Sequence, residues 1–290
     1  MSNLKTSMNK ADIVNTKKNQ YLEYSKWICV VMIAVCTILL RLNINSKLIV
    51  MTAIIFAMLF IFAFIHGTQR YGIKNMLIWF AITWGVSNCL EGLSIKMGFP
   101  FGHYHYTMAG PRILNVPMLI MIAYFGLAYM SSCVAQAVTT HYGKKFAGLS
   151  KFIIPFMTAF VMTMWDLATD PPASTIGKSW IWENGGAYYG VPISNFFGWF
   201  FVIFIFMQIF TLFMSNKNTD ISPNNITSQK SYWLQPVLIY LILGLGIILE
   251  GFTHTSNVDI YSSMAMISFF TMVFTALISI LNIQNAKELS

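Results

Sequence analysis

Apolar residues dominate eight stretches of the chain, each close to the length that crosses a bilayer as a helix. A helical span needs about 20 apolar residues. The pattern predicts such helices over residues 27–43, 48–66, 75–95, 114–139, 152–168, 193–215, 233–251 and 260–283. We therefore expect an all-α, polytopic membrane bundle of about eight helices, or of seven if the first stretch does not span.

Composition agrees with this pattern. The chain has 290 residues, of which 56% are hydrophobic and 10% charged, and its mean hydropathy is +0.62. One soluble domain of this length could not bury so much apolar surface. Residues 1–26 are polar and lysine-rich, so we expect a disordered cytoplasmic tail there, with no cleavable signal peptide. Residues 27–285 would form a single transmembrane domain.

The distribution of basic residues predicts the orientation. With the N-terminus inside, the inner segments hold thirteen Lys and Arg residues and the outer segments hold five. Positive charge gathers on the cytoplasmic side of short loops. The chain is thus expected in the cell membrane with both termini cytoplasmic. The net charge of +8 is spread over these loops and forms no basic patch, which argues against nucleic acid as a partner.

Acidic residues mark two helix ends on the outer side. Trp84, Asn88 and Glu91 follow at spacings of four and three and share a helix face. Asn88 could orient the Glu91 carboxyl and Trp84 could shield it from water, so that it keeps its proton as a general acid must. A structural hydrogen bond between helices is the alternative. Glu250 is a third acid at the end of a span, where ionisable groups are often functional.

The second acidic motif is MWDLATDPP, residues 164–172. Asp166 and Asp170 are one helical turn apart and face the same way, and Pro171 and Pro172 end the helix after them. Two adjacent carboxylates do not both ionise cheaply, so either one holds a proton or the pair shares a divalent cation such as Mg²⁺. A plain helix end is disfavoured, because acids there oppose the helix dipole.

Two long outer segments, 96–113 and 169–192, are rich in Gly, Pro and aromatic residues and are expected to fold back over the bundle. In GFPFGHYHY, residues 98–106, the glycines and Pro100 would shape a turn that presents Tyr104 and Tyr106 to the acids. His103 and His105 lack a third strong ligand nearby, so a structural role is favoured over a metal site. In WIWENGGAYYGVPISNFFGW, residues 180–199, aromatic rings could stabilise a cation or form an ordinary interfacial belt.

Together these motifs resemble the membrane carotenoid-biosynthesis proteins. The resemblance rests on E-G-x-x-x-x-x-G-x-P-F-G-x-Y-x-Y (91–106), V-P (116–117), W-D-L-x-x-D-P (165–171), W-x-W (180–182) and G-x-Y-x-G-x-P-x-x-N-x-x-G-W (186–199), within residues 75–215. That family includes carotenoid 1,2-hydratases, which act on linear C40 and C50 carotenoids such as bacterioruberin precursors. No P-loop, dinucleotide fingerprint, G-x-S-x-G elbow or HExxH motif is present in the sequence.

The resemblance implies acid-catalysed hydration of a terminal double bond through a tertiary carbocation, without a cofactor. Asp166 would donate the proton, assisted by Asp170, and Glu91 with Asn88 would hold the water. The apolar substrate would enter from the lipid. The residues expected to line its site are Trp84, Phe101, Tyr104, Tyr106, Trp165, Trp180, Trp182, Tyr188, Asn195 and Trp199.

Three other functions remain open from the sequence. A terpene or carotenoid cyclase would use the same protonation but let a second alkene capture the cation. A UbiA-like prenyltransferase would use Asp166 and Asp170 to hold Mg²⁺, although Asn88 with Glu91 makes a poor second acidic motif. A non-catalytic lipid-binding membrane protein would leave the acids within the spans unexplained.

Overall fold

The structure is a computed structural model that describes residues 10–42, 48–217 and 226–290. Eight helices in these segments are long and apolar enough to cross a membrane, which confirms the expected all-α bundle. The helices are α1 (Lys10–Arg41), α2 (Leu48–Tyr71), α3 (Ile73–Met97), α4 (Met118–Val138), α5 (Ser150–Asp170), α6 (Ile193–Ser215), α7 (Lys230–Thr253), α8 (Val258–Ser268) and α9 (Phe274–Asn285). A π-helical turn, Phe269–Val273, joins α8 to α9 into one span.

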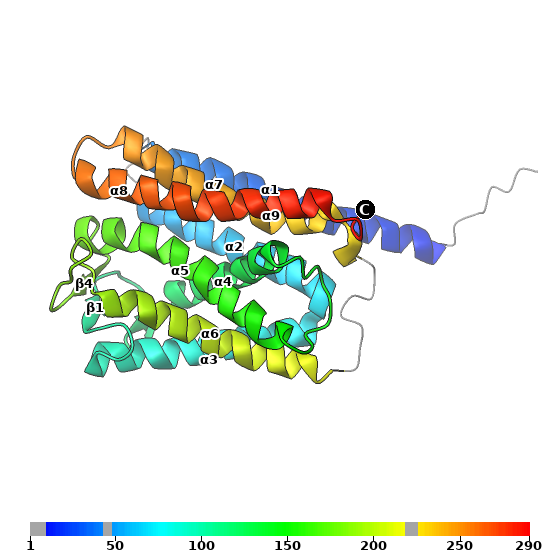
Figure 1. Ribbon diagram of the computed structural model, residues 1–290, viewed down its shortest axis with the longest axis horizontal. Coiled ribbons are helices and arrows are strands. Elements are labelled where there is room, and N and C mark those ends of the chain that lie inside the picture. The colour runs from blue at the N-terminus through cyan, green and yellow to red at the C-terminus, as the bar shows by residue number, and fades with distance from the viewer. Residues whose placement is uncertain (1–9, 43–47, 218–225) are drawn as a thin grey trace, which may run out of the picture.

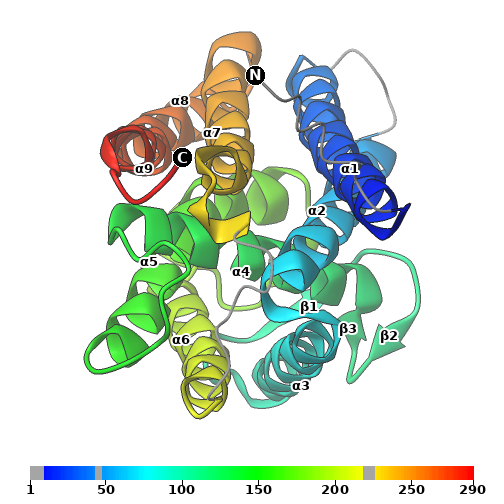
Figure 2. The same cartoon turned by 90° about the vertical axis from the view of Figure 1, so that its right-hand side faces the viewer.

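Helix α4 lies at the centre of the bundle (Figure 2). It packs against α2, α3, α5, α7 and α9. In the apolar window of α4, 78% of the residues are buried, against at most 50% in any other span. A central helix has no face turned to lipid, so its polar side chains must find partners within the protein.

The first helix begins earlier than the sequence suggested. Residues 10–26, expected to be a disordered tail, belong to α1, which packs along α7. Glu23 explains part of this: it pairs with Lys26 at 2.6 Å and accepts a hydrogen bond from Gln235 on α7 at 2.5 Å. Glu23, which precedes the apolar stretch, therefore has a partner on a neighbouring helix. Residues 1–9 of the expected tail lie outside the described residues.

The two long segments after α3 and α5 meet at one end of the bundle, on the left of Figure 1. Strand β1 (Tyr104–Tyr106) pairs antiparallel with β4 (Trp180–Trp182); we call this pair the ribbon. A second small pair joins β2 (Arg112–Ile113) to β3 (Val116–Pro117). Helix α5 ends at Asp170, as its prolines predicted, but the chain continues through a π-helical turn, Pro171–Ile176. The 3₁₀ turn Ile226–Ser228 precedes α7.

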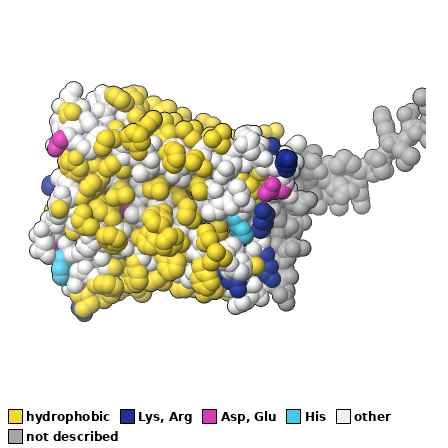
Figure 3. All heavy atoms as spheres, in the orientation of Figure 1, with side chains coloured by type: hydrophobic (Ala, Val, Ile, Leu, Met, Phe, Trp, Pro, Cys, Tyr) yellow, Lys and Arg dark blue, Asp and Glu magenta, His cyan; other side chains and the backbone are white. Residues whose placement is uncertain are grey.

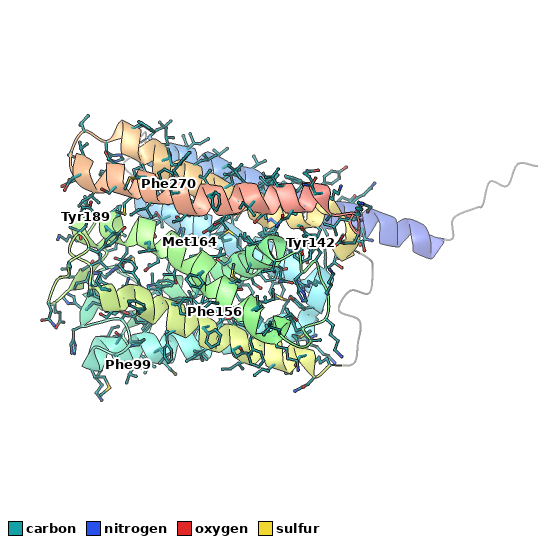
Figure 4. The ribbon with its side chains drawn as sticks, viewed as in Figure 1. Phe99, Tyr142, Phe156, Met164, Tyr189 and Phe270 are labelled. Atoms are coloured by element: carbon teal, nitrogen blue, oxygen red, sulfur yellow. The ribbon has the colours of Figure 1, made fainter. Side chains whose placement is uncertain are left out.

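The surface is that of a membrane protein. Apolar side chains cover the middle of the face in Figure 3, while charged side chains lie at its two ends. Figure 4 shows Phe156 and Phe270 along this face, and both side chains are exposed although large and apolar. Such a band suits lipid rather than water. The chain is thus a multi-pass membrane protein.

Candidate functional site

Glu91 lies on the inner face of α3 and is 2% exposed. Three phenols hold its carboxyl. Tyr104 and Tyr106 donate hydrogen bonds to Oε2, the latter at 3.0 Å, and Tyr124 of α4 donates to Oε1 at 2.7 Å. Both carboxyl oxygens therefore have donors, as a buried acid requires.

Strand geometry explains why two of these phenols converge. Alternate residues of a strand point to opposite faces, so Tyr104 and Tyr106 are buried toward Glu91 while His105 is exposed between them. Burial raises the pKa of the Tyr106 phenol well above its usual range, and the neighbouring Glu91 adds to this. Tyr106 consequently remains a hydrogen-bond donor at any working pH.

Asp166 and Asp170 lie one turn apart at the end of α5 and are 2% and 1% exposed. One amide nitrogen binds both: Asn195 Nδ2, in the first turn of α6, lies 2.9 Å from Asp166 Oδ2 and 2.7 Å from Asp170 Oδ2. The Trp180 indole donates to Asp170 Oδ1 at 3.0 Å. Two carboxyls that share one donor in a buried site do not both ionise cheaply, which favours a state in which one of them holds a proton.

The ribbon joins the two acid sites. Its register places Tyr104 opposite Trp182 and Tyr106 opposite Trp180, with ring centroids 4.8 Å and 6.1 Å apart. One strand thus supplies donors to Glu91 and the other a donor to Asp170. Glu91 and Asp170 are also close enough to interact electrostatically. The three carboxyls form one group, which we call the acid cluster.

Aromatic rings cover the acid cluster on the side of α6. Trp199 stacks on Tyr124 with centroids 4.7 Å apart and an angle of 6° between the planes. Trp165 and Phe101 approach Trp199 at 6.2 Å and 6.3 Å. Gly198 permits this approach, because a Cβ there would lie 2.7 Å from the Phe101 ring. These rings could face a positive charge that forms beside the acids.

The expected contact of Asn88 with Glu91 differs in the structure. The Asn88 amide donates to the Ile113 carbonyl at 3.1 Å rather than to Glu91. Trp84 packs edge-on against Phe80, and the Tyr188 hydroxyl donates to the Leu167 carbonyl at 2.9 Å. The contacts of these three residues are therefore with a loop carbonyl, a neighbouring ring and a helix carbonyl. Glu250, singled out in the sequence as an acid at a span's end, instead pairs with Arg41 and joins α7 to α1.

Tyr124 is a member of the site that the sequence did not reveal. It lies in an apolar stretch of α4, where an aromatic residue is ordinarily core. Only the central position of α4 could have identified Tyr124, because a phenol buried in a central membrane helix needs a hydrogen-bond partner. Asn195 was expected only as a lining residue, and in the structure its amide bridges the two aspartates.

The histidines lie on the outside of the ribbon end. His105 faces Glu183, with Nδ1 3.5 Å from Oε1, and both side chains are about half exposed. The His103 ring lies against Gly98, whose φ of +81° and lack of a Cβ allow the contact. Within the described ranges, no three His, Cys, Asp or Glu residues are grouped as metal ligands would be.

This geometry defines a polytopic helical membrane protein with a buried, aromatic-walled acid cluster. A family model of carotenoid biosynthesis proteins matches residues 44–255, more than half of the chain. The protein belongs to the family of carotenoid biosynthesis proteins. The match extends beyond the motifs noted in the sequence to include α2 and all of α7. No curated protein and no solved structure matches the chain.

Proposed function

We propose that the protein is a membrane enzyme that hydrates a terminal double bond of an acyclic carotenoid by acid catalysis. The observation that carries this proposal is the pair of buried aspartates, Asp166 and Asp170, bound by a single amide of Asn195. Such a pair stores a proton inside an apolar protein. An isolated trisubstituted alkene needs a strong acid of this kind and no cofactor.

The reaction would begin with proton transfer from Asp166 to the terminal alkene. The C=C π electrons form the new C–H bond, and a tertiary carbocation is left on the adjacent carbon. The Trp199 and Tyr124 rings would stabilise this charge through their π faces. Neither ring is a strong nucleophile, so the cation would not be trapped by the wall itself.

Water then captures the cation. Its oxygen forms the C–O bond, and the proton lost from the oxonium passes to Glu91 and returns to the aspartate pair before the next turnover. The net change is the addition of one water to one alkene. The three phenols on Glu91 support this assignment, because they fix the position of its carboxyl within the acid cluster.

The substrate would reach the site from the bilayer. A carotenoid is wholly apolar along its chain, and the acid cluster lies within spans that are surrounded by exposed apolar side chains. We further propose that both termini are cytoplasmic. The described basic residues gather mainly at the end opposite the ribbon (Figure 3), as the positive-inside rule requires.

Expression together with an acyclic-carotenoid pathway, followed by mass spectrometry of the pigments, tests the proposal. Hydration adds the mass of one water. A cyclase would leave the mass unchanged and alter retention, and a prenyltransferase would lengthen the chain and stop when Mg²⁺ is chelated. Asp166→Asn should abolish turnover, whereas Asp259→Asn, an exposed acid in the first turn of α8, should not. Turnover by folded Asp166→Asn would refute the assignment of the acid.

A further inference from the structure

A row of polar side chains leads along the buried face of α3 to the acid cluster. Trp79, Thr83, Ser87 and Glu91 follow one another at intervals of four residues, and each is at most 2% exposed. Residues four apart share a helix face. At 1.5 Å per residue, the row covers about 18 Å of the membrane depth.

The first three members of the row have no hydrogen-bond partner among the described residues: Trp79 Nε1, Thr83 Oγ1 and Ser87 Oγ. Thr37 on α1 and Thr163 on α5 also lack a hydrogen-bond partner among the described residues, but other buried hydroxyls bond to their own helices. Thr158 donates to the Ile154 carbonyl at 2.7 Å, and Ser279 to the Thr275 carbonyl at 2.8 Å. A polar group left unpaired at membrane depth is costly, so the α3 row needs partners that are not protein.

Helix α4 adds to the same row. Ser131 lies two turns from Tyr124 on the same face of α4, and its hydroxyl is likewise unpartnered among the residues described. Because Tyr124 reaches Glu91, Ser131 is about 10 Å further from the ribbon, near the depth of Thr83. Donors and acceptors on two neighbouring helices thus occupy one level of the bundle.

The end of the row that lies away from the ribbon is Trp79, which contacts a second set of polar residues. The Trp79 ring lies edge-on to Tyr129, with centroids 6.4 Å apart. The Tyr129 hydroxyl bonds to His66 Nδ1 at 2.7 Å. Arg70, one turn further along α2, donates to Gln136 at 2.7 Å and lies over the Tyr71 ring, and its Nε and Nη1 have no hydrogen-bond partner among the described residues. Polar groups therefore extend from the basic end of the bundle to Glu91.

The chemistry of the row selects its ligand. A carotenoid chain offers no donor or acceptor, so it would leave these groups unpaired. A metal ion cannot bind the indole N–H of Trp79. Water both donates and accepts, and it commonly fills such gaps between buried polar groups.

The opposite route to the acids is closed by protein. Tyr104, Tyr106 and Phe101 are buried where the ribbon end covers the cluster. We infer that the α3 row, with Ser131, binds a file of ordered water molecules that supplies the acid cluster from the basic end. This inference rests on the proposed function, since each hydration consumes one water.

Two substitutions test the supply role: Thr83→Val and Ser87→Ala, singly and combined. Thr158→Val and Ser279→Ala are matched controls that remove hydroxyls already bonded to their own helices. Purified protein is incubated with an unlabelled acyclic carotenoid in D₂O. Protonation then adds deuterium, and a cation that is not captured loses H⁺ to a carboxylate and returns as a deuterated alkene.

We expect the ratio of hydrated to merely deuterated product to fall at least 10-fold in the Thr83→Val/Ser87→Ala variant, with deuterium uptake retained. The controls should keep the wild-type ratio. An unchanged ratio in the double variant would overturn the supply role. If wild-type protein neither hydrates nor deuterates the substrate, the proposed function fails. The presence of bound water along the row is then tested by footprinting, which needs no turnover.

Hydroxyl-radical footprinting of the full-length protein detects bound water without any turnover. Trp79 should be oxidised despite its burial, because radicals form from adjacent water. Tyr240 is the reference, since it is also fully buried but its hydroxyl donates to the Val161 carbonyl at 2.8 Å. Protection of Trp79 equal to that of Tyr240 would refute the file.

Discussion

The indole of Trp199 lies parallel to the phenol of Tyr124, with their centroids 4.7 Å apart. The same Tyr124 hydroxyl holds Glu91. One contact therefore ties the aromatic wall on α6 to the acid on α3 through the central helix α4. A cation formed at the acids would meet this stacked pair, which motivates the first prediction.

Trp199→Leu should lower turnover by about 30-fold, because a desolvated cation–π contact is worth about 2 kcal/mol. Phe197→Leu is the control: it removes a ring from the same helix, but its side chain is exposed on the apolar surface. Hydrated carotenoid formed per folded protein is measured for both. Equal rates in the two variants would contradict a role of Trp199 in stabilising the cation.

Tyr124→Phe should lower the free energy of unfolding by about 1–3 kcal/mol, since it leaves Glu91 Oε1 without its donor. It should also lower turnover. Tyr240→Phe offers a comparison, because that buried phenol donates to the Val161 carbonyl at 2.8 Å, away from the acids. We expect it to reduce stability and spare activity. Full activity of Tyr124→Phe would show that the third phenol is not needed for catalysis.

Asn195 and Asp170 should be energetically coupled. Asn195→Leu removes the donor shared by two buried carboxyls, and Asp170→Leu removes one of the acceptors. The stability loss of the double variant should differ from the sum of the single losses by about 0.5–3 kcal/mol, as is typical of direct contacts. Detergent-titrated unfolding of the four proteins measures this. Strict additivity would mean that the amide does not hold the pair.

His141 lies in the segment between α4 and α5, and the burial of its imidazole leads us to expect that stability depends on pH. Burial lowers the pKa of His141 to about 4, and the charges of Arg70 and Lys144 contribute. The unfolded imidazole has a pKa of about 6.5, so between these values the unfolded chain binds more protons. Stability from this residue is complete above pH 6.5 and is lost as pH falls toward 4.

Unfolding midpoints at pH 7.5, 5.5 and 4.5 check this dependence. His141→Gln cannot be protonated, so its midpoint should fall less steeply over the same interval than that of the wild type. Parallel curves for the two proteins would assign the acid sensitivity to other groups.

The bundle was predictable because a membrane helix must satisfy its own backbone, which makes apolar stretches of about 20 residues nearly unambiguous. All eight expected stretches overlap spans in the structure. The start of α1 was not predictable in this way, because residues 10–26 are polar and the apolar pattern begins only at residue 27. Glu23, within this part of the helix, accepts a hydrogen bond from Gln235 on α7, far along the chain.

The acids of the site were also visible in the sequence, because carboxyls in apolar stretches are conspicuous. Their partners were less so. Asn88 shares a helix face with Glu91, yet its amide binds a loop carbonyl, and the acid is held by tyrosines from two other elements. Helical spacing shows which residues can meet on one helix, but the pairing of β1 with β4 joins segments far apart in sequence.

The three-residue pairing of the ribbon also limits how this family member can vary. Moving β1 by one residue would turn His105 inward and both tyrosines outward, because successive strand residues alternate faces. One residue, His105, separates the two phenols, so inserting or deleting a single residue there would place them on opposite faces of the strand and leave only one able to reach Glu91. Such a change should be about as damaging as removing the acid itself.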